Sequence, residues 1–162
     1  MVSLATPLAA LFDNILLQID ALELICLRHE VQIEYIKPHG ALYHDMMQRE
    51  DIATLLCDVI KTRKYQLTLI VQAGVNTKKI TAIARSKGVP LQLEAFADRK
   101  YRGIQLIPRS ETGSILATPQ QIQTQYQQLS ESSSFQVDTI CFYSDHSPSV
   151  IALKKIAATG AC

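Results

Sequence analysis

This chain of 162 residues has no basic stripe, and its formal net charge is only +1. Nucleic-acid binding depends on clustered lysine and arginine that neutralise phosphates, so we expect no nucleic-acid partner. No apolar run approaches the ~20 residues of a membrane span, and the apolar start lacks a basic leader and is interrupted at Pro7 and Asp13. We therefore expect neither a membrane protein nor a signal peptide.

Cysteine pairs, phosphate loops and dense metal motifs are also missing. The cysteines number four, without a CxxC pair: Cys26, Cys57, Cys141 and Cys162. This scatter predicts buried, reduced thiols in a cytoplasmic protein. Gly74 stands alone, so nucleotide binding by the chain by itself is unsupported. Histidine and aspartate at several strand ends leave a metal open, but no spacing matches a metal motif, and we assign no metal ligand.

Helix and strand patterns alternate along the chain. Strands are expected at 31–36, 67–71, 91–95 and 137–142. Helices are expected over 8–25, from 41 or 46 to 62, from a cap at Asn76 to Gly88, over 119–130 and from 147. Thr118 and Gln121 have the spacing of a capping box, and the long irregular stretch 96–113 is typical of functional loops. The order predicts one α/β domain, 1–162, of parallel β/α units with right-handed crossovers.

Polar side chains follow all four expected strands, at the ends where parallel sheets bind ligands. They are Lys37 and His39, then Gln72 and Asn76, then Glu94, Asp98 and Arg99, and finally Ser144, Asp145 and His146. The opposite ends carry ordinary turn residues such as Lys64 and Gly88. This asymmetry predicts a site at the carboxyl ends of the strands.

Each of these groups also has a structural explanation. Glu94 is costly to bury unless paired, so Glu94 and Asp98 could form a salt-bridge network with Arg99 and Arg109. Alternatively, an arginine binds a substrate carboxylate while a carboxylate acts as a base. Lys37 could be a solvated cation and His39 a structural histidine, or both could serve the site. Asp145 could cap the last helix, and Asp45 is expected to cap or solvate the start of its helix.

Four blocks of the sequence resemble the LamB/YcsF family, which is associated with the A subunit of 5-oxoprolinase. Ile36–Tyr43 is similar to the signature V-K-P-H-G-A-L-Y, and Glu94–Tyr101 to E-x-F-A-D-R-x-Y. Leu106–Arg109 followed by Gly113 is similar to L-x-x-R with its glycine turn, and 138–145 to D-T-I-C-x-x-x-D. The blocks occur in the family's order and cover nearly the whole chain.

The resemblance implies a seven-stranded (β/α) barrel of the glycoside hydrolase/deacetylase type, of which about four strands are present here. It implies ATP-dependent opening of the 5-oxoproline lactam to glutamate, together with subunits B and C. The expected catalytic residues are Lys37, His39, Glu94 and Asp98. The expected substrate-binding residues are Tyr43, Arg99, Arg109 and Asp145.

Some family patterns are missing from this chain. The N-terminal patterns D-L-N-x-D-x-G-E, A-C-G-x-H-A-G-D and G-A-H-P-S do not occur, so the chain corresponds to the C-terminal part of the barrel. His44 stands where the family often has Asn, and Tyr143–His146 where it often has His-Gly-Asp-x. Four strands cannot close a barrel, so we expect a homo-oligomer or an edge covered by the first helix. The alternative function is that of a non-catalytic, truncated remnant with a binding or assembly role.

Overall fold

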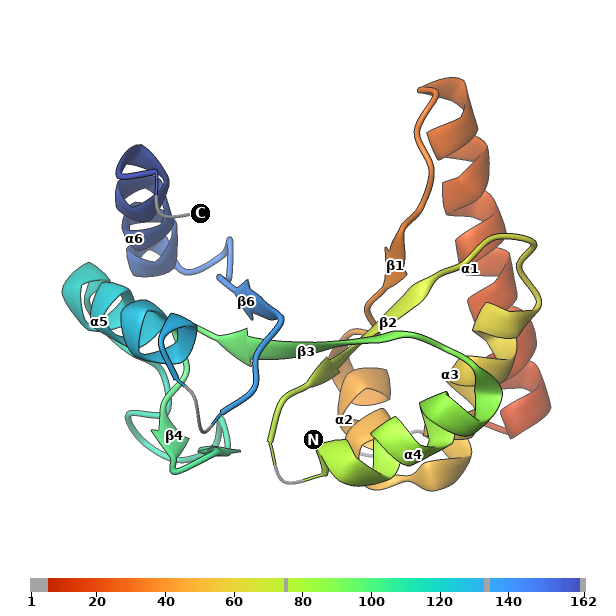
Figure 1. Cartoon of the computed structure of the whole chain (residues 1–162), viewed down its shortest axis with the longest axis horizontal. Coiled ribbons are helices and arrows are strands. Elements are labelled where there is room, and N and C mark those ends of the chain that lie inside the picture. Colours follow the sequence, from red (N-terminus) through yellow and green to blue (C-terminus); the bar gives the residue numbers. More distant parts are fainter. Residues whose placement is uncertain (1–5, 75, 133–134, 161–162) are drawn as a thin grey trace. The chain divides into compact units, whose positions relative to one another are not determined.

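A computed structural model describes residues 6–74, 76–132 and 135–160 (Figure 1). The helices are α1 Leu8–Arg28, α2 Gly40–Gln48, α3 Glu50–Lys61, α4 Thr77–Lys87, α5 Pro119–Ser130 and α6 Ser147–Ala158. The strands are β1 Tyr35–Ile36, β2 Thr68–Gln72, β3 Leu91–Phe96, β4 Tyr101–Arg102, β5 Gln105–Leu106 and β6 Thr139–Cys141. The chain forms two compact units: the first is Met1–Val71 with Asn76–Gln92, and the second is Gln72–Val75 with Leu93–Cys162.

The main sheet has the strand order β1-β2-β3-β6. β1 pairs with β2 in parallel, with Tyr35 opposite Thr68, and β3 pairs with β6 in parallel, with Phe96 opposite Cys141. Parallel strands connected through helices confirm the expected α/β class. The first and last strands are shorter than the sequence pattern predicts, because only two and three residues join the ladder.

The core of the first unit is built around α3. One broad face of this helix is buried, including Ile52, Leu56 and Val59, as its strong amphipathic pattern requires. The sequence predicted a single helix up to residue 62, but the structure has two helices, α2 and α3. They are separated at Arg49, whose backbone is extended (φ −121°, ψ 118°). Glu50 and Asp51 then occupy the first turn of α3, where acidic side chains favour a helix start.

Two polar residues of the first unit differ from their expected roles. Asn76 was expected to cap α4 but makes no side-chain cap; its Nδ2 donates instead to the Met47 carbonyl at 2.8 Å. Asp45 was expected at a helix start, yet it lies inside α2 and is only 2% exposed. Both departures depend on residues distant in sequence or on tertiary burial, which a local pattern does not reveal.

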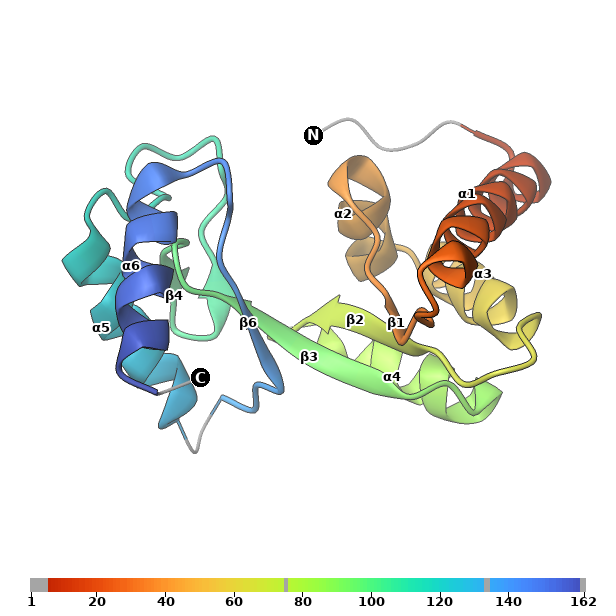
Figure 2. The ribbon, with the colours of Figure 1, turned by 90° about the horizontal axis from the view of Figure 1, so that it is seen from above.

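The second unit packs α5 and α6 side by side (Figure 2). Its buried cluster contains Ala97, Leu116, Ile122 and Ala152, with Ile140 and Phe142 packed against it. The expected capping box is confirmed: the Gln121 backbone N–H donates to Thr118 Oγ1, and the Thr118 N–H donates to Gln121 Oε1. The stretch predicted as irregular contains a short antiparallel pair, β4 and β5.

The outer surface of α1 is unusually apolar. Leu11, Ile15 and Ile19 are buried, as the periodicity predicts, but Leu22 and Ile25 on the same predicted face are 49% and 53% exposed. Within the first unit, the C-terminal half of α1 borders a hollow of about 590 Å³, lined mainly by α1 and residues 31–33. In the part of the chain that the structure describes, no helix is both long and apolar enough to cross a membrane.

Candidate functional site

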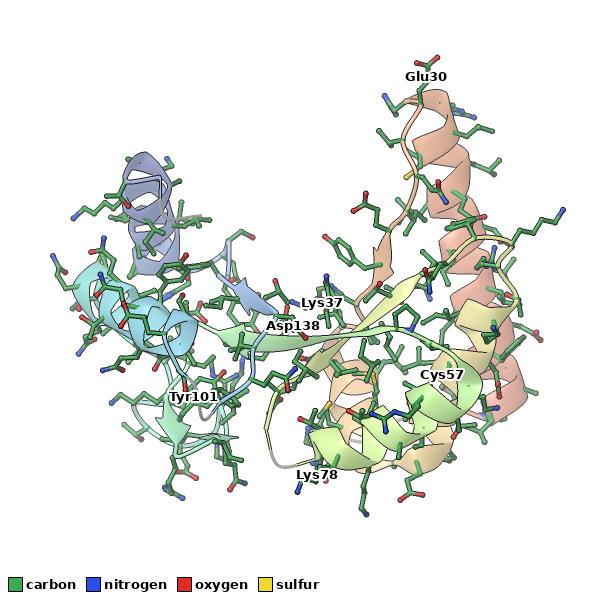
Figure 3. All side chains as sticks on the ribbon, in the orientation of Figure 1. Glu30, Lys37, Cys57, Lys78, Tyr101 and Asp138 are labelled. Atoms are coloured by element: carbon green, nitrogen blue, oxygen red, sulfur yellow. The ribbon has the colours of Figure 1, made fainter. Side chains whose placement is uncertain are left out.

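The expected site residues are divided between the two units. Lys37, His39 and Tyr43 belong to the first unit, and Lys37 follows β1 directly (Figure 3). Glu94, Asp98, Arg99, Arg109 and Asp145 belong to the second unit. Each group is therefore described within its own unit.

The turn from β1 into α2 presents the first group. Pro38 is buried, while His39 is exposed and holds the N-cap position of α2 without a side-chain cap. Gly40 has φ +61°, a left-handed conformation that side chains disfavour. Proline and glycine thus fix the path of this turn, and His39 projects from it toward solvent rather than serving as a structural cap.

Among the expected site residues of the second unit, Asp98 is the most buried, with 1% of its surface exposed. Its Oδ2 accepts hydrogen bonds from the Tyr143 backbone N–H at 3.1 Å and from Ser149 Oγ at 3.0 Å. His146 Nδ1 lies 3.9 Å from the same oxygen. The other oxygen, Oδ1, is buried and has no hydrogen-bond partner among the residues that the structure describes. Asp98 therefore ties the end of β3 to the loop that leads into α6 and keeps one oxygen unused.

Arg99 does not pair with Asp98. Its side chain is buried and its Nη2 donates to the Ile107 carbonyl at 2.7 Å. Burial, and next the charge of Arg109, lower the pKa of the Arg99 guanidinium. The salt bridge between Asp98 and Arg99, one of the two alternatives that the sequence left open, does not form: Arg99 supports the loop by binding its backbone.

Arg109 has a different environment from Arg99. It is exposed, and its guanidinium carbon lies 4.6 Å from the centre of the Tyr143 ring, within cation–π range. Tyr143 in turn stacks on Phe96, with ring centres 5.9 Å apart and planes inclined by 11°. The aromatic pair holds one face of the guanidinium and leaves its N–H groups available, so Arg109 is the better of the two arginines for an anionic ligand.

Other residues of the family blocks have structural roles. The Tyr101 hydroxyl (Figure 3) accepts a hydrogen bond from the Phe96 N–H at 2.8 Å, and burial raises the pKa of Tyr101. Asp138 (Figure 3) exchanges two hydrogen bonds with the Leu93 backbone and so fixes β6 beside β3. Asp145 is exposed, and the N-cap of α6 is His146, so Asp145 does not cap this helix.

Glu94 is buried, with 3% of its surface exposed, and stands opposite Thr139 in the β3–β6 ladder. It lies before the end of β3, whereas Asp98 lies beyond it. Among the residues that the structure describes, no group of three or more metal-ligating side chains forms.

The sequence placed His146 among the strand-end polar residues but gave a role only to Asp145, and it did not single out Ser149. The sequence signal was the pair Asp145-His146 after the fourth strand. The structure places His146, not Asp145, beside the buried carboxylate. The separation of Asp98 from His146 along the chain hides this contact from local patterns.

The fold and the site define a parallel β/α protein with polar groups at the carboxyl ends of its strands. The LamB/YcsF family profile matches residues 3–160, and the chain belongs to this family. The resemblance inferred from the four sequence blocks is thereby confirmed.

Relatives with curated names support the same family. The chain is 33% identical to the A subunit of 5-oxoprolinase from Vibrio vulnificus (strain YJ016), over 94% of this chain and 65% of that protein. It is 30% identical to a 5-oxoprolinase A subunit, numbered 3, from Pseudomonas aeruginosa, over 96% of this chain and 66% of that protein. The chain thus spans only 65% of the length of the Vibrio vulnificus relative.

A solved structure shares the fold. The lactam utilization protein from Thermus thermophilus superimposes with a TM-score of 0.84 at 25% identity. The match covers 98% of this chain and 68% of that protein. The chain therefore has the fold of the corresponding part of a lactam utilization protein.

Proposed function

We propose that this chain contributes to the ATP-dependent opening of the 5-oxoproline lactam to glutamate, as part of a 5-oxoprolinase acting with subunits B and C. The names of the relatives support the reaction and an assembly of several subunits. The observation that carries the proposal is the buried Asp98 carboxylate, which is linked through Tyr143 to the Arg109 guanidinium. Lactam opening needs proton transfer, and 5-oxoproline carries a carboxylate that an arginine can bind.

In this proposal Arg109 binds the substrate carboxylate, and Tyr143 holds the guanidinium in place. Glu94, Lys37 and His39 handle protons, and Asp98 supplies the buried carboxylate that supports proton transfer. Tyr43 and Asp145 contact the substrate, and Arg99 supports the loop that carries Arg109. ATP is the cofactor, supplied in the complex with the partner subunits, and the cytoplasm is the compartment.

The test is 5-oxoproline-dependent ATP hydrolysis by this chain mixed with subunits B and C. We expect Arg109→Ala to raise KM for 5-oxoproline at least about tenfold, since a charge-assisted pair contributes about 1.5–3 kcal/mol. Arg109→Lys should recover only part of this loss, because lysine lacks the bidentate fork. Arg102→Ala is the matched control: Arg102 is exposed and lies 3.4 Å from Glu111. If a folded wild-type chain shows no 5-oxoproline-dependent ATP hydrolysis with subunits B and C, the proposal is contradicted.

A second candidate is a non-catalytic role in binding or assembly. The exposed apolar residues of α1 favour it. Calorimetry with 5-oxoproline and co-purification with subunits B and C separate the candidates. Binding to the subunits without substrate-dependent turnover supports the second candidate and contradicts the first.

A further inference from the structure

Within the described part of the second unit, Asp98 Oδ1 and His146 Nδ1 are neighbouring buried atoms without a hydrogen-bond partner. An unsatisfied buried polar group costs about 1–3 kcal/mol, and more when it is charged. The His146 nitrogen lies 3.9 Å from Asp98 Oδ2, about 1 Å beyond hydrogen-bond distance. Hydrogen bonds between catalytic groups are often long before a ligand binds and tighten afterwards.

We propose that His146 is the proton-exchanging group of this site and that Asp98 is its positioning residue; the assignment rests on the proposed function. An Nδ1–H directed at Asp98 fixes the imidazole tautomer and leaves the Nε2 lone pair for a substrate proton. The side chain of His146 is 26% exposed although its Nδ1 is buried. The ring thus has one edge toward the carboxylate and another open to solvent.

The surroundings of Asp98 keep its negative charge available to His146. Its Oδ2 is held by the Tyr143 N–H and by the Ser149 hydroxyl in the first turn of α6, where the helix dipole favours an anion. Among the residues that the structure describes, no arginine forms a salt bridge with this carboxylate, and the neighbouring Arg99 donates to the Ile107 carbonyl. These contacts orient the carboxylate without consuming Oδ1.

Tyr143 connects this pair to the carboxylate-binding residue. Its backbone N–H bonds Asp98, and its ring lies under the Arg109 guanidinium. A substrate whose carboxylate is bound by Arg109 is thereby held next to the loop that carries His146. Because Tyr143 alone connects Arg109 to the Asp98–His146 pair, the site suits a small carboxylic acid whose reacting group lies close to its carboxylate.

In the hydrolytic step water adds across the lactam carbon–nitrogen bond and His146 ends in its starting protonation state, while ATP is consumed with the partner subunits as in the proposed function. As the water oxygen forms its bond to the lactam carbonyl carbon, His146 Nε2 accepts one water proton. When the carbon–nitrogen bond breaks, the same Nε2 returns this proton to the leaving nitrogen. Asp98 stays ionised throughout and stabilises the transient imidazolium.

The first test measures the tautomer by ¹⁵N–¹H NMR of the full chain, with the His146 signals assigned by comparison with His146→Gln. We expect neutral His146 to carry its proton on Nδ1. In Asp98→Asn this preference should be lost, because an amide can donate as well as accept a hydrogen bond and therefore accommodates either tautomer of His146. A wild-type Nε2–H tautomer, or a tautomer that Asp98→Asn leaves unchanged, overturns the proposal.

The second test measures kcat and KM in the assay with subunits B and C. We expect His146→Ala to lower kcat about 100-fold or more, with little change in KM and partial rescue by added imidazole. Asp98→Asn should lower kcat about 10- to 100-fold, as loss of an orienting partner does. His44→Ala, a histidine exposed on α2, should retain wild-type kinetics.

The two tests separate failure of the inference from failure of the proposed function. An active wild-type complex in which His146→Ala retains its kcat overturns the role of His146. A wild-type complex without turnover contradicts the proposed function, and the NMR result then decides the Asp98–His146 pair alone. In that case the Nδ1–H tautomer and its loss in Asp98→Asn still support the pair, and the Nε2–H tautomer rejects it.

Discussion

At the scale of single residues, the end of β3 shows how the second unit manages buried charge. Asp98 is held by a backbone N–H and a hydroxyl rather than by a cation, and Arg99 is held by a backbone carbonyl. The two opposite charges on consecutive residues form no direct salt bridge, so each side chain makes its hydrogen bonds elsewhere. Arg99 supports the loop, and Asp98 keeps its Oδ1 without a hydrogen bond to the described residues.

Among the glycines, Gly74 is the one whose replacement by alanine should be least tolerated for steric reasons. Its φ is +135°, and an added Cβ would lie 2.7 Å from the Ile104 carbonyl oxygen. Because this contact involves backbone, no side-chain movement relieves it. We expect Gly74→Ala to lower the free energy of unfolding by about 2 kcal/mol or more, measured by urea denaturation. Gly103→Ala (φ +62°, open surroundings) should cost only about 1 kcal/mol; equal losses for both variants would contradict the steric argument.

How far residue roles could be predicted depends on the distance between partners. Lys37, Glu94 and Asp98 could be placed at strand ends because the β/α alternation is a local pattern. The partner of Asp98 could not be predicted, because His146 is brought to it only by the pairing of β3 with β6. The Asn76 side chain was misassigned for the same reason, since it bonds Met47 rather than its own helix.

At the scale of elements, the start of α5 contains its own stabilising contacts. Thr118 and Gln121 satisfy each other's backbone N–H groups, and Pro119 follows the cap. Because every partner lies within three positions, this helix start was predictable from sequence. The break between α2 and α3 was not, since the apolar pattern continues across Arg49 and only its extended backbone ends the first helix.

The capping box of α5 makes a direct prediction about stability. Thr118→Ala removes the acceptor of the Gln121 N–H, so we expect the free energy of unfolding to fall by about 1 kcal/mol. Thr124→Ala, an exposed position in the same helix, should be neutral or slightly stabilising because alanine favours helix. Chemical denaturation followed by circular dichroism measures both variants. An equal effect of the two substitutions would show that the cap does not contribute.

At the scale of the whole molecule, the first unit exposes large apolar side chains to solvent, and this exposure needs an explanation. Leu17, Leu24, Leu27 and Val31 are 66%, 63%, 74% and 58% exposed. Large exposed apolar side chains gathered on one element are a common feature of interaction sites. The sequence predicted either a homo-oligomer or an edge covered by the first helix. The hollow between α1 and residues 31–33 shows that this helix leaves its own surroundings partly open, which favours assembly.

We therefore expect the purified chain to self-associate through α1. Burying apolar surface contributes about 25 cal/mol per Å², so several large side chains together can sustain a dimer. Light scattering coupled to size exclusion should give a mass above the 18.0 kDa of one chain, and Leu24→Glu with Leu27→Glu should restore the monomer. Leu153→Glu, at a 39% exposed leucine of α6, is the matched control and should leave the assembly intact. A monomeric wild-type chain, or dissociation by Leu153→Glu alone, would show that α1 does not form the contact.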